Sequence, residues 1–351
     1  MKTVIIIPSL DPDDKLIGYV GELIEAGQNN ILLIDDGSSK ERRKYFDEIR
    51  DRYGVKILTH HINMGKGRAL KDAFNYCLTE IPECEGVITV DSDGQHSVKD
   101  VLRMAEDLEE HRDSLILGAR NFRKSNVPFK SEYGNRITRN IVKLLYGGNI
   151  TDTQTGLRAL SYDILPSFLT LEGERFEYET GMLIEALRQH IPIREVEIET
   201  IYIEENKGSH FRPLQDSWKI YKLILGTFLK YSIVSLISAA LDLGIFHLIV
   251  SLLSGAKLGE MVWIATVGAR IVSSLFNYTA NKNVVFGSGK GVATLVKYYI
   301  LCIVQMCLSA LLVWLLAGVI GLPKVLIKAV VDTVLFFLSF RIQKAWVFRE
   351  K

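Results

Sequence analysis

Two carboxylates and an amide follow an apolar segment in the first half of the chain. Residues 87–95 read Val-Ile-Thr-Val-Asp-Ser-Asp-Gly-Gln, which places Asp91, Asp93 and Gln95 at alternate positions. Such oxygen ligands suit Mg²⁺ or Mn²⁺ rather than zinc, and Mg²⁺ is usually held by one or two carboxylates together with substrate phosphates. The spacing therefore indicates a divalent-cation site for a phosphate-bearing substrate. The alternative is a solvated turn, in which Asp, Ser and Gly are common.

The elements that must position this segment follow a regular pattern. Short apolar segments with the composition of strands cover residues 4–8, 31–34, 55–59, 87–90 and 115–117. Helical stretches lie between them at residues 15–25, 40–53, 66–78 and 99–111. Continuous apolar strands that alternate with amphipathic helices predict an α/β domain with a mostly parallel sheet.

Polar residues stand where three of these strands end. Asp35 and Asp36 follow the second strand, residues 91–93 follow the fourth, and Arg120 follows the fifth. In open α/β sheets, ligands bind outside the carboxyl ends of the strands. The three polar clusters therefore predict one site at that edge of the sheet.

A glycine-rich segment opens the third predicted helix. Asn63-Met-Gly-Lys-Gly-Arg68 has glycines that allow close backbone approach, and a helix N-terminus favours anions. The alternative is a plain helix start with Asn63 as its N-cap. The segment is not a P-loop, and no Gly-x-Gly-x-x-Gly follows the first strand, which excludes the usual dinucleotide site.

Taken in order, these motifs resemble the inverting family-2 glycosyltransferases. The motifs that match are Ile7-Pro8, Asp35-Asp36-Gly37-Ser38, Asn63-x-Gly65-Lys66-Gly67-x-Ala69-Leu70 and Asp91-x-Asp93-x-Gln95-His96. Four later motifs resemble the polyprenyl-phosphate branch, which includes the dolichyl-phosphate mannose synthases: Gly118-Ala119-Arg120, Asp152-x-x-Thr155-Gly156-x-Arg158, Phe176-Glu177-Tyr178-Glu179 and Ser209-His210-Phe211-Arg212. The resemblance spans residues 3–220 and implies a GT-A-type, Rossmann-like fold. One departure is that Ser9 to Asp13 stand where the family usually has Thr-Tyr-Asn-Glu, so that either Asp11 or Asp13 would supply the acidic residue near the nucleotide base.

The resemblance also implies roles for individual residues. Those expected at the nucleotide sugar are Pro8, Asp35, Asp36, Asn63, Lys66, Asp91, Ser92, Asp93 and Arg212. Those expected at the Mg²⁺ or Mn²⁺ ion are Asp91, Asp93 and Gln95, and those expected at the acceptor phosphate are Arg120, Arg136 and Arg139. Catalysis is assigned to Asp91, Asp93, Arg120 and Arg136. Ser209, His210 and Arg212 would lie on a loop that closes over the diphosphate, and Asp35 could instead be a strand-end cap.

The activity that these roles imply is transfer of a hexose from GDP-mannose or a UDP-sugar to a polyprenyl phosphate, either dolichyl or undecaprenyl phosphate. A glycosyltransferase that acts on a hydroxyl acceptor would need a general base, for which Asp152 and Glu179 are candidates. The Gln-x-x-Arg-Trp motif of processive synthases is absent from the sequence. Translocation of a lipid-linked sugar is the non-enzymatic alternative.

The second half of the chain is mostly apolar. Four segments approach the roughly 20 residues that cross a bilayer, at about residues 229–253, 261–280, 295–320 and 325–346. Buried helices of a soluble domain are the alternative. Lysines and arginines gather before the first segment, between the second and third, and in the tail, so the positive-inside rule predicts that both termini are cytoplasmic.

An internal repeat organises these apolar segments. Residues 281–286 read Asn-Lys-Asn-Val-Val-Phe, and residues 343–348 read Gln-Lys-Ala-Trp-Val-Phe, which suggests a duplicated helix pair. The pattern resembles the GtrA-like membrane domain. Asp242 and Arg270 lie at similar depth in adjacent segments, and we expect them to pair, because isolated charges are costly in a bilayer.

These patterns divide the chain into three parts. Residues 1–210 are the expected cytosolic catalytic domain, residues 211–228 an amphipathic linker at the membrane interface, and residues 229–351 the GtrA-like domain. Residues 135–146 form a second interfacial candidate, or an ordinary helix on the sheet. The net charge of +1 disfavours a nucleic-acid partner, and we expect no signal peptide. Cys77 and Cys84 lack zinc-type spacing and Cys302 and Cys307 lie in an apolar segment, so we expect all four cysteines to be reduced and structural. The sequence leaves the oligomeric state open.

Overall fold

The computed structural model describes residues 2–121, 129–199, 212–253, 257–287, 292–319 and 323–348. The chain forms two compact units, which comprise residues 1–224 and 225–351. Ser209 and His210, which the sequence assigned to a loop over the diphosphate, lie outside the described residues.

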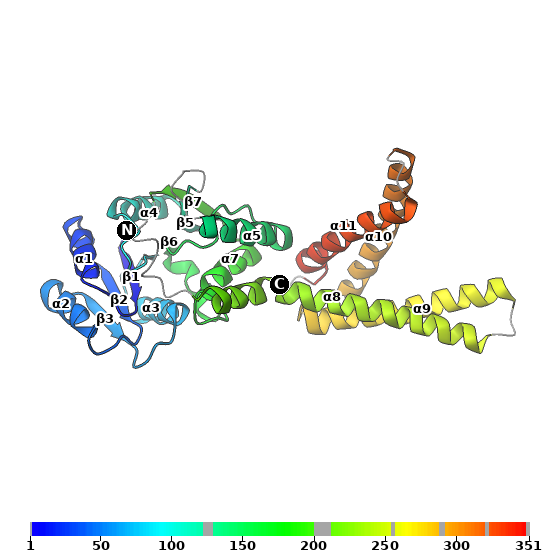
Figure 1. The fold of residues 1–351 in the computed structure, drawn as a ribbon, viewed down its shortest axis with the longest axis horizontal. Coiled ribbons are helices and arrows are strands. Elements are labelled where there is room, and N and C mark those ends of the chain that lie inside the picture. Colours follow the sequence, from blue (N-terminus) through cyan, green and yellow to red (C-terminus); the bar gives the residue numbers. More distant parts are fainter. Residues whose placement is uncertain are drawn as a thin grey trace. The chain divides into compact units, whose positions relative to one another are not determined.

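The first unit is built on one seven-stranded sheet (Figure 1). Its strands are β1 Thr3–Ser9, β2 Ile31–Asp35, β3 Lys56–Thr59, β4 Gly86–Thr89, β5 Leu115–Arg120, β6 Arg158–Ser161 and β7 Ile193–Ile198, in the order β3-β2-β1-β4-β6-β5-β7. Only β6 runs against its neighbours β4 and β5 among the strand pairs of the described residues. The predicted α/β fold with a mostly parallel sheet is therefore confirmed, and all five predicted strands are present.

The sequence did not predict β6 and β7. β6 has only four residues, and β7 reads Ile-Arg-Glu-Val-Glu-Ile with mostly exposed or half-buried side chains. Each lacks the continuous apolar run that marks a strand buried on both faces, as β1 is along its whole length.

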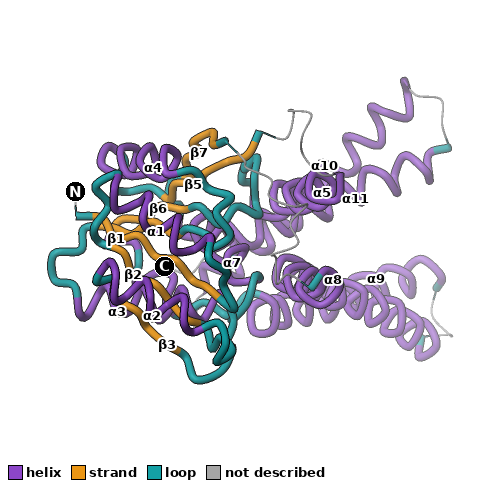
Figure 2. The backbone as a smooth tube through the Cα atoms, turned by 60° about the vertical axis from the view of Figure 1, so that its left-hand side comes forward, coloured by secondary structure: helices purple, strands orange, loops and turns teal. Residues whose placement is uncertain are grey.

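Helices cover both faces of this sheet (Figure 2). They are α1 Lys15–Glu25, α2 Arg43–Tyr53, α3 Lys66–Glu80, α4 Val98–Glu110, α5 Phe129–Tyr146, α6 Pro166–Leu169 and α7 Glu177–Gln189, with a 3-10 turn, η1, at Tyr162–Ile164. The alternation of side chains along β1 sends Ile5 and Ile7 into the core formed with α1, α2 and α4, whereas α3 contacts β1 and packs against α7. The central strands β1, β2 and β4 are thereby buried on both faces, and only their polar carboxyl ends remain open for a site.

The second unit is helical. It contains most of α8 Pro213–Leu252, then α9 Leu258–Ala280, α10 Val292–Val319 and α11 Lys324–Ile342. Within the described residues, two helical segments are long and apolar enough to cross a membrane, Leu214–Leu252 and Val292–Ala317. α9 and α11 coincide with the other two predicted spans, whose crossing of a membrane stays a prediction.

The internal repeat has a structural counterpart. Each repeated motif forms a π-helical turn, η3 at Asn281–Val285 and η4 at Gln343–Val347, and the Asn281 side-chain amide donates to Gln343 Oε1 over 3.2 Å. The expected contact between α8 and α9 is also present: Arg270 Nη2 lies 3.5 Å from Asp242 Oδ2.

Candidate functional site

A pocket opens at the carboxyl ends of the central strands. From β1 the chain continues to β2 on one side, and it later returns as β4 on the other side. In open α/β sheets such a switch point is where ligands bind. The residues that line the pocket are Pro8, Ser9, Leu10, Asp36, Asn63, Gly65, Lys66, Asp91, Ser92, Asp93, Arg175 and Phe176.

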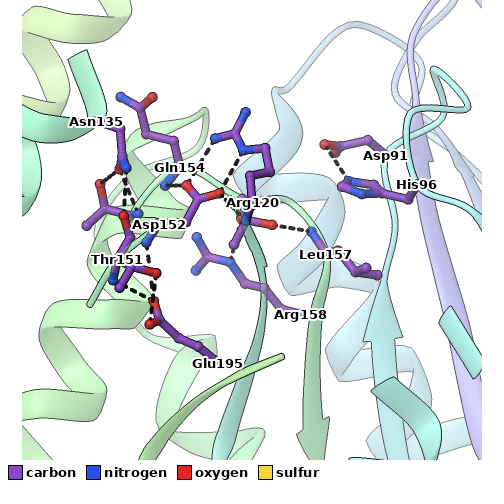
Figure 3. Close-up of polar contacts among 12 residues, drawn as sticks. Asp91, His96, Arg120, Asn135, Thr151, Asp152, Gln154, Leu157, Arg158 and Glu195 are labelled. Carbon is purple, nitrogen blue, oxygen red and sulfur yellow. Dashed lines mark hydrogen bonds and ion pairs between the residues drawn. The ribbon is translucent and has the colours of Figure 1, made fainter. Parts of the chain in front are cut away.

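Lys66 joins two carboxylates at the centre of this pocket. Its Nζ lies 2.6 Å from Asp91 Oδ1 and 2.9 Å from Glu179 Oε1. On the other side, Asp91 Oδ2 lies 3.5 Å from His96 Nε2 (Figure 3). Asp91 is therefore held between Lys66 and His96, two residues after the end of β4.

Burial and the neighbouring charges shift the pKa values of Asp91 and Lys66 in opposite directions. Burial alone would raise the pKa of Asp91, but the charges of Lys66 and His96 hold that pKa well below its usual range. Burial would lower the pKa of Lys66, but Asp91 and Glu179 raise it above its usual range. The pKa of Asp93 is raised by burial and by the nearby Asp91 carboxylate. Asp91 and Lys66 are thus a charged pair, whereas Asp93 forms no ion pair within the described residues, and the more distant Lys66 and His96 only partly offset its burial.

The residues that the sequence assigned to a metal fit a magnesium-type ion. No three His, Cys, Asp or Glu side chains among the described residues form a metal-binding group. Asp91, Asp93 and Gln95 instead offer two carboxylates and an amide on one turn, where Asp93 Oδ1 also accepts the Gln95 backbone N–H over 3.1 Å. One or two carboxylates completed by substrate phosphates are the usual protein ligands of Mg²⁺, and a cation would offset the burial of Asp93.

The glycines of the 63–68 segment make room for the protein's own backbone. A Cβ on Gly65, whose φ is +102°, would lie 2.4 Å from the Glu174 carbonyl oxygen, and one on Gly67 would lie 2.8 Å from that of Arg175. The N-cap of α3 is Gly65, so the alternative that placed Asn63 at the cap is wrong. Close packing of the 174–178 segment on α3 brings Lys66 and Glu179 together.

The two aspartates after β2 have local structural contacts. Asp36 lines the pocket, and its carboxylate accepts the backbone N–H groups of Met64 and Gly65 over 2.9 and 2.8 Å. Asp35 is buried and accepts the Ser38 N–H over 2.8 Å, which is the strand-end cap that the sequence left open. Asp11 Oδ1 accepts the Ser39 N–H over 2.8 Å, which places Asp11 beside this loop.

Gly156, two residues before β6, packs against Asp91. A Cβ at position 156 would lie 2.3 Å from Asp91 Oδ2, so only glycine leaves the carboxylate its place. The next motif residue in the core, Arg158, is 1% exposed and donates from Nη1 to the Glu179 carbonyl over 2.6 Å. This part of the motif therefore packs against Asp91 and holds the backbone at Glu179.

Arg120 forms a two-pronged pair with a buried carboxylate. Its Nε and Nη2 lie 2.7 and 3.0 Å from the two oxygens of Asp152, which is fully buried (Figure 3). Asn135 on α5 and Glu195 on β7 hold the flanking Thr151–Thr153 segment through backbone and hydroxyl groups. Asp152 therefore fixes the guanidinium at the end of β5.

None of the four predicted arginines, Arg120 included, is among the described residues that line the pocket. Arg136 is exposed and Arg139 partly exposed, both on α5. Arg212 lies just before α8, where its backbone N–H donates to Asp216 over 2.7 Å. The sequence in turn missed Arg175 and Phe176 as pocket residues, although Phe176 opens a motif that it had singled out.

Comparison with known proteins identifies the family to which this chain belongs. The glycosyl transferase family 2 profile matches residues 5–168, and the GtrA/DPMS transmembrane domain profile matches residues 211–348. The chain belongs to glycosyl transferase family 2. An uncharacterized protein of Methanocaldococcus jannaschii is 30% identical over 226 residues, which cover 63% of this chain and 90% of the relative.

Other relatives of this chain carry the names of enzymes. UDP-N-acetylglucosamine–dolichyl-phosphate N-acetylglucosaminyltransferase of Methanococcus voltae is 28% identical over 57% of this chain and 86% of its own. This glycosyltransferase is thus related to enzymes named for dolichyl phosphate and, in further relatives, for undecaprenyl phosphate. The fold is shared with glucosyl-3-phosphoglycerate synthase of Mycobacterium tuberculosis in complex with Mn²⁺, UDP-glucose and phosphoglyceric acid. That structure has a TM-score of 0.50 and 15% identity, over 64% of this chain and 78% of that one.

Proposed function

We propose that this family-2 glycosyltransferase transfers a hexose from a nucleotide diphosphate sugar, GDP-mannose or a UDP-sugar, to a polyprenyl phosphate. The observation that carries the proposal is the pocket of Asp91, Asp93 and Lys66 at the strand ends, in a chain that also has a GtrA/DPMS domain. The relatives named for dolichyl and undecaprenyl phosphate support the choice of acceptor.

The proposed acceptor is already nucleophilic at neutral pH. The second pKa of a phosphate monoester is about 6, so an oxyanion is present without a general base. A phosphate oxygen attacks the anomeric carbon, the bond from that carbon to the diphosphate oxygen breaks, and the nucleoside diphosphate leaves. No proton has to be moved, and one in-line displacement inverts the anomeric centre.

The task left to the protein is to position anions and to neutralise their charge. Arg120, whose guanidinium Asp152 fixes at the end of β5, is our candidate for the acceptor phosphate, with Arg136 and Arg139 as further candidates. Arginine suits that task because the guanidinium N–H groups that do not face Asp152 can donate to phosphate oxygens. Asp91, kept ionised by Lys66, would orient the sugar and ribose.

A divalent ion, Mg²⁺ or Mn²⁺, would be held by Asp93 and Gln95 with Asp91. When bound, it supplies positive charge to the departing diphosphate. We propose that the apolar helices anchor the enzyme in the membrane, with the catalytic unit and both termini in the cytoplasm, where nucleotide sugars are available.

The proposal is tested by transfer of label into lipid. Purified full-length protein in detergent is incubated with undecaprenyl or dolichyl phosphate, Mg²⁺ or Mn²⁺, and radiolabelled GDP-mannose, UDP-glucose or UDP-N-acetylglucosamine in turn. Label from one donor should enter the organic phase, and both EDTA and Asp93→Asn should abolish it. Absence of lipid label from every donor, in protein that binds a nucleotide, would point to a different acceptor.

Translocation of the lipid-linked sugar is a second candidate, and paired charges in the apolar helices favour it. Arg270 pairs with Asp242, and Lys328 Nζ lies 2.8 Å from Asp332 Oδ2. Ionisable groups in membrane helices often mark a substrate path. In vesicles, sugar transferred on one leaflet should become accessible to an enzyme on the other, and Asp242→Asn should stop this without changing transfer.

A further inference from the structure

Arg175 lines the pocket from the position just before the Phe176–Glu179 motif, and the sequence assigned no role to Arg175 itself. Its side chain is 17% exposed and lines the pocket together with Lys66, Asp91 and Asp93. The two glycines at the start of α3 fix the segment, because a Cβ on Gly65 would also lie 2.8 Å from Arg175 Cγ. Arg175 is thus a nearly buried cation that close packing holds against the N-terminal end of α3.

The carboxylate that pairs with Arg175 lies on the first turn of α8. Asp216 is 1% exposed, and its Oδ1 lies 3.4 Å from Arg175 Nε. Its other oxygen accepts the Arg212 backbone N–H over 2.7 Å. Asp216 therefore accepts a backbone N–H at the start of α8 with one oxygen and orients Arg175 with the other.

The two cations that line the pocket within the described residues differ in their surroundings. Lys66 contacts two carboxylates, one of which also lines the pocket. The ion-pair partner of Arg175 is Asp216, which does not line the pocket. Arg175 therefore contributes positive charge that pocket carboxylates do not already balance. Its contact with Asp216 uses Nε, and a guanidinium has four further N–H groups for an anion.

We infer that Arg175 binds the diphosphate of a nucleoside diphosphate in this pocket, and that Asp216 is the positioning residue that aims its guanidinium. The inference rests on the proposed function for the presence of such a donor. It deepens that function by assigning recognition of the phosphates to the contact between the 174–178 segment and the first turn of α8. A charge-assisted hydrogen bond of this kind changes affinity by about 10- to 100-fold.

The test measures binding of UDP and GDP to the full-length protein in detergent by calorimetry, and of uridine and guanosine by competition. For the diphosphate that wild-type protein binds, Arg175→Gln should raise Kd about 10- to 100-fold and leave the affinity for the matching nucleoside unchanged. Arg194→Gln is the matched control, because Arg194 also pairs with one aspartate, Asp107 at 3.3 Å, but does not line the pocket.

The Asp216→Asn variant tests whether Asp216 acts by orienting Arg175 rather than by stabilising the fold. It should raise Kd for the diphosphate by about 3- to 10-fold, again without effect on the nucleoside. Combined with Arg175→Gln it should add nothing further, because Asp216 acts through Arg175. An additive loss in the double variant would overturn the positioning role.

Two outcomes distinguish this inference from the function on which it rests. If wild-type protein binds neither UDP nor GDP, both fail. If it binds one of them and Arg175→Gln binds it equally well, or loses the nucleoside to the same extent, only the inference fails. Should Arg175→Gln not fold, Arg175→Met decides: it keeps the packing of the aliphatic stem but removes the charge, and diphosphate affinity equal to wild type would overturn the inference.

Discussion

Removal of the Lys66 ammonium should destabilise the fold, because two partly buried carboxylates lose the cation between them. Lys66→Met leaves the carboxylates of Asp91 and Glu179, which are 31% and 9% exposed, without the cation between them. Loss of one partner from a buried ion pair costs about 3–5 kcal/mol, and the partial exposure of Asp91 favours the lower end, about 3 kcal/mol. In a domain of this size, 1 kcal/mol shifts Tm by about 2–4 °C, so Tm should fall by about 6–12 °C at pH 7.5.

The fall in Tm caused by Lys66→Met should be smaller at acid pH than at neutral pH. The folded-state pKa of Asp91 is below the unfolded value of about 4, so its pairing stabilises the protein above that value and is lost as pH falls through the folded pKa. Without Lys66 that pKa rises, and protonation relieves the variant at mildly acid pH. The Tm difference between wild type and Lys66→Met should therefore narrow between pH 7.5 and pH 4.5.

The assay is thermal unfolding of full-length protein in detergent, with Lys71→Met as the control. Lys71 lies on the same helix and its Nζ lies 2.9 Å from Glu174 Oε1, but Glu174 is 49% exposed. Such a pair contributes about 1 kcal/mol or less. If Lys66→Met loses no more than Lys71→Met, or loses the same amount at both pH values, the account of a buried cation between two carboxylates is refuted.

Three further substitutions address the rest of the site. Gly156→Ala places a Cβ 2.3 Å from Asp91 Oδ2, and the displaced carboxylate should lower lipid-linked transfer about 100-fold and also lower Tm, because its pair with Lys66 is disturbed. Asp152→Asn removes the charge that fixes Arg120, so Tm should fall by several degrees and transfer should drop more than nucleotide binding, as measured by calorimetry. Asp93→Asn should keep Tm near the wild-type value, because the pKa of this carboxyl is already raised, while transfer no longer responds to Mg²⁺ or Mn²⁺.

Matched variants control these substitutions. A Cβ on Gly18 would meet nothing within 4 Å, so Gly18→Ala should leave transfer unchanged. Asp107 pairs with Arg194 away from the pocket, so Asp107→Asn should not affect transfer. Equal activity in Gly156→Ala and wild type, unchanged Tm in Asp152→Asn, or metal-stimulated transfer by Asp93→Asn would each contradict the role assigned to that residue.

The sequence determined the α/β fold and the side of the sheet that carries the pocket. Continuous apolar runs mark strands buried on both faces, and parallel strands end at the same edge, so Asp36 and Asp91 had to be neighbours in space. Periodicity could not find β7, because an edge strand with exposed side chains carries no apolar run. The paired charges Asp242 and Arg270 were predictable, because few partners exist for a charge in an apolar helix.

Only the tertiary structure decided how the charges of the site are arranged. The Lys66–Glu179 contact joins residues 113 positions apart, and the Arg175–Asp216 contact joins residues 41 positions apart. Neither follows from a local repeat, because each depends on how closely the 174–178 segment packs on α3. From the sequence, the motif glycines were expected to let the backbone approach a phosphate. In the folded chain, Gly65 and Gly67 instead make room for the backbone of residues 174 and 175. The glycines thereby determine which cations line the pocket.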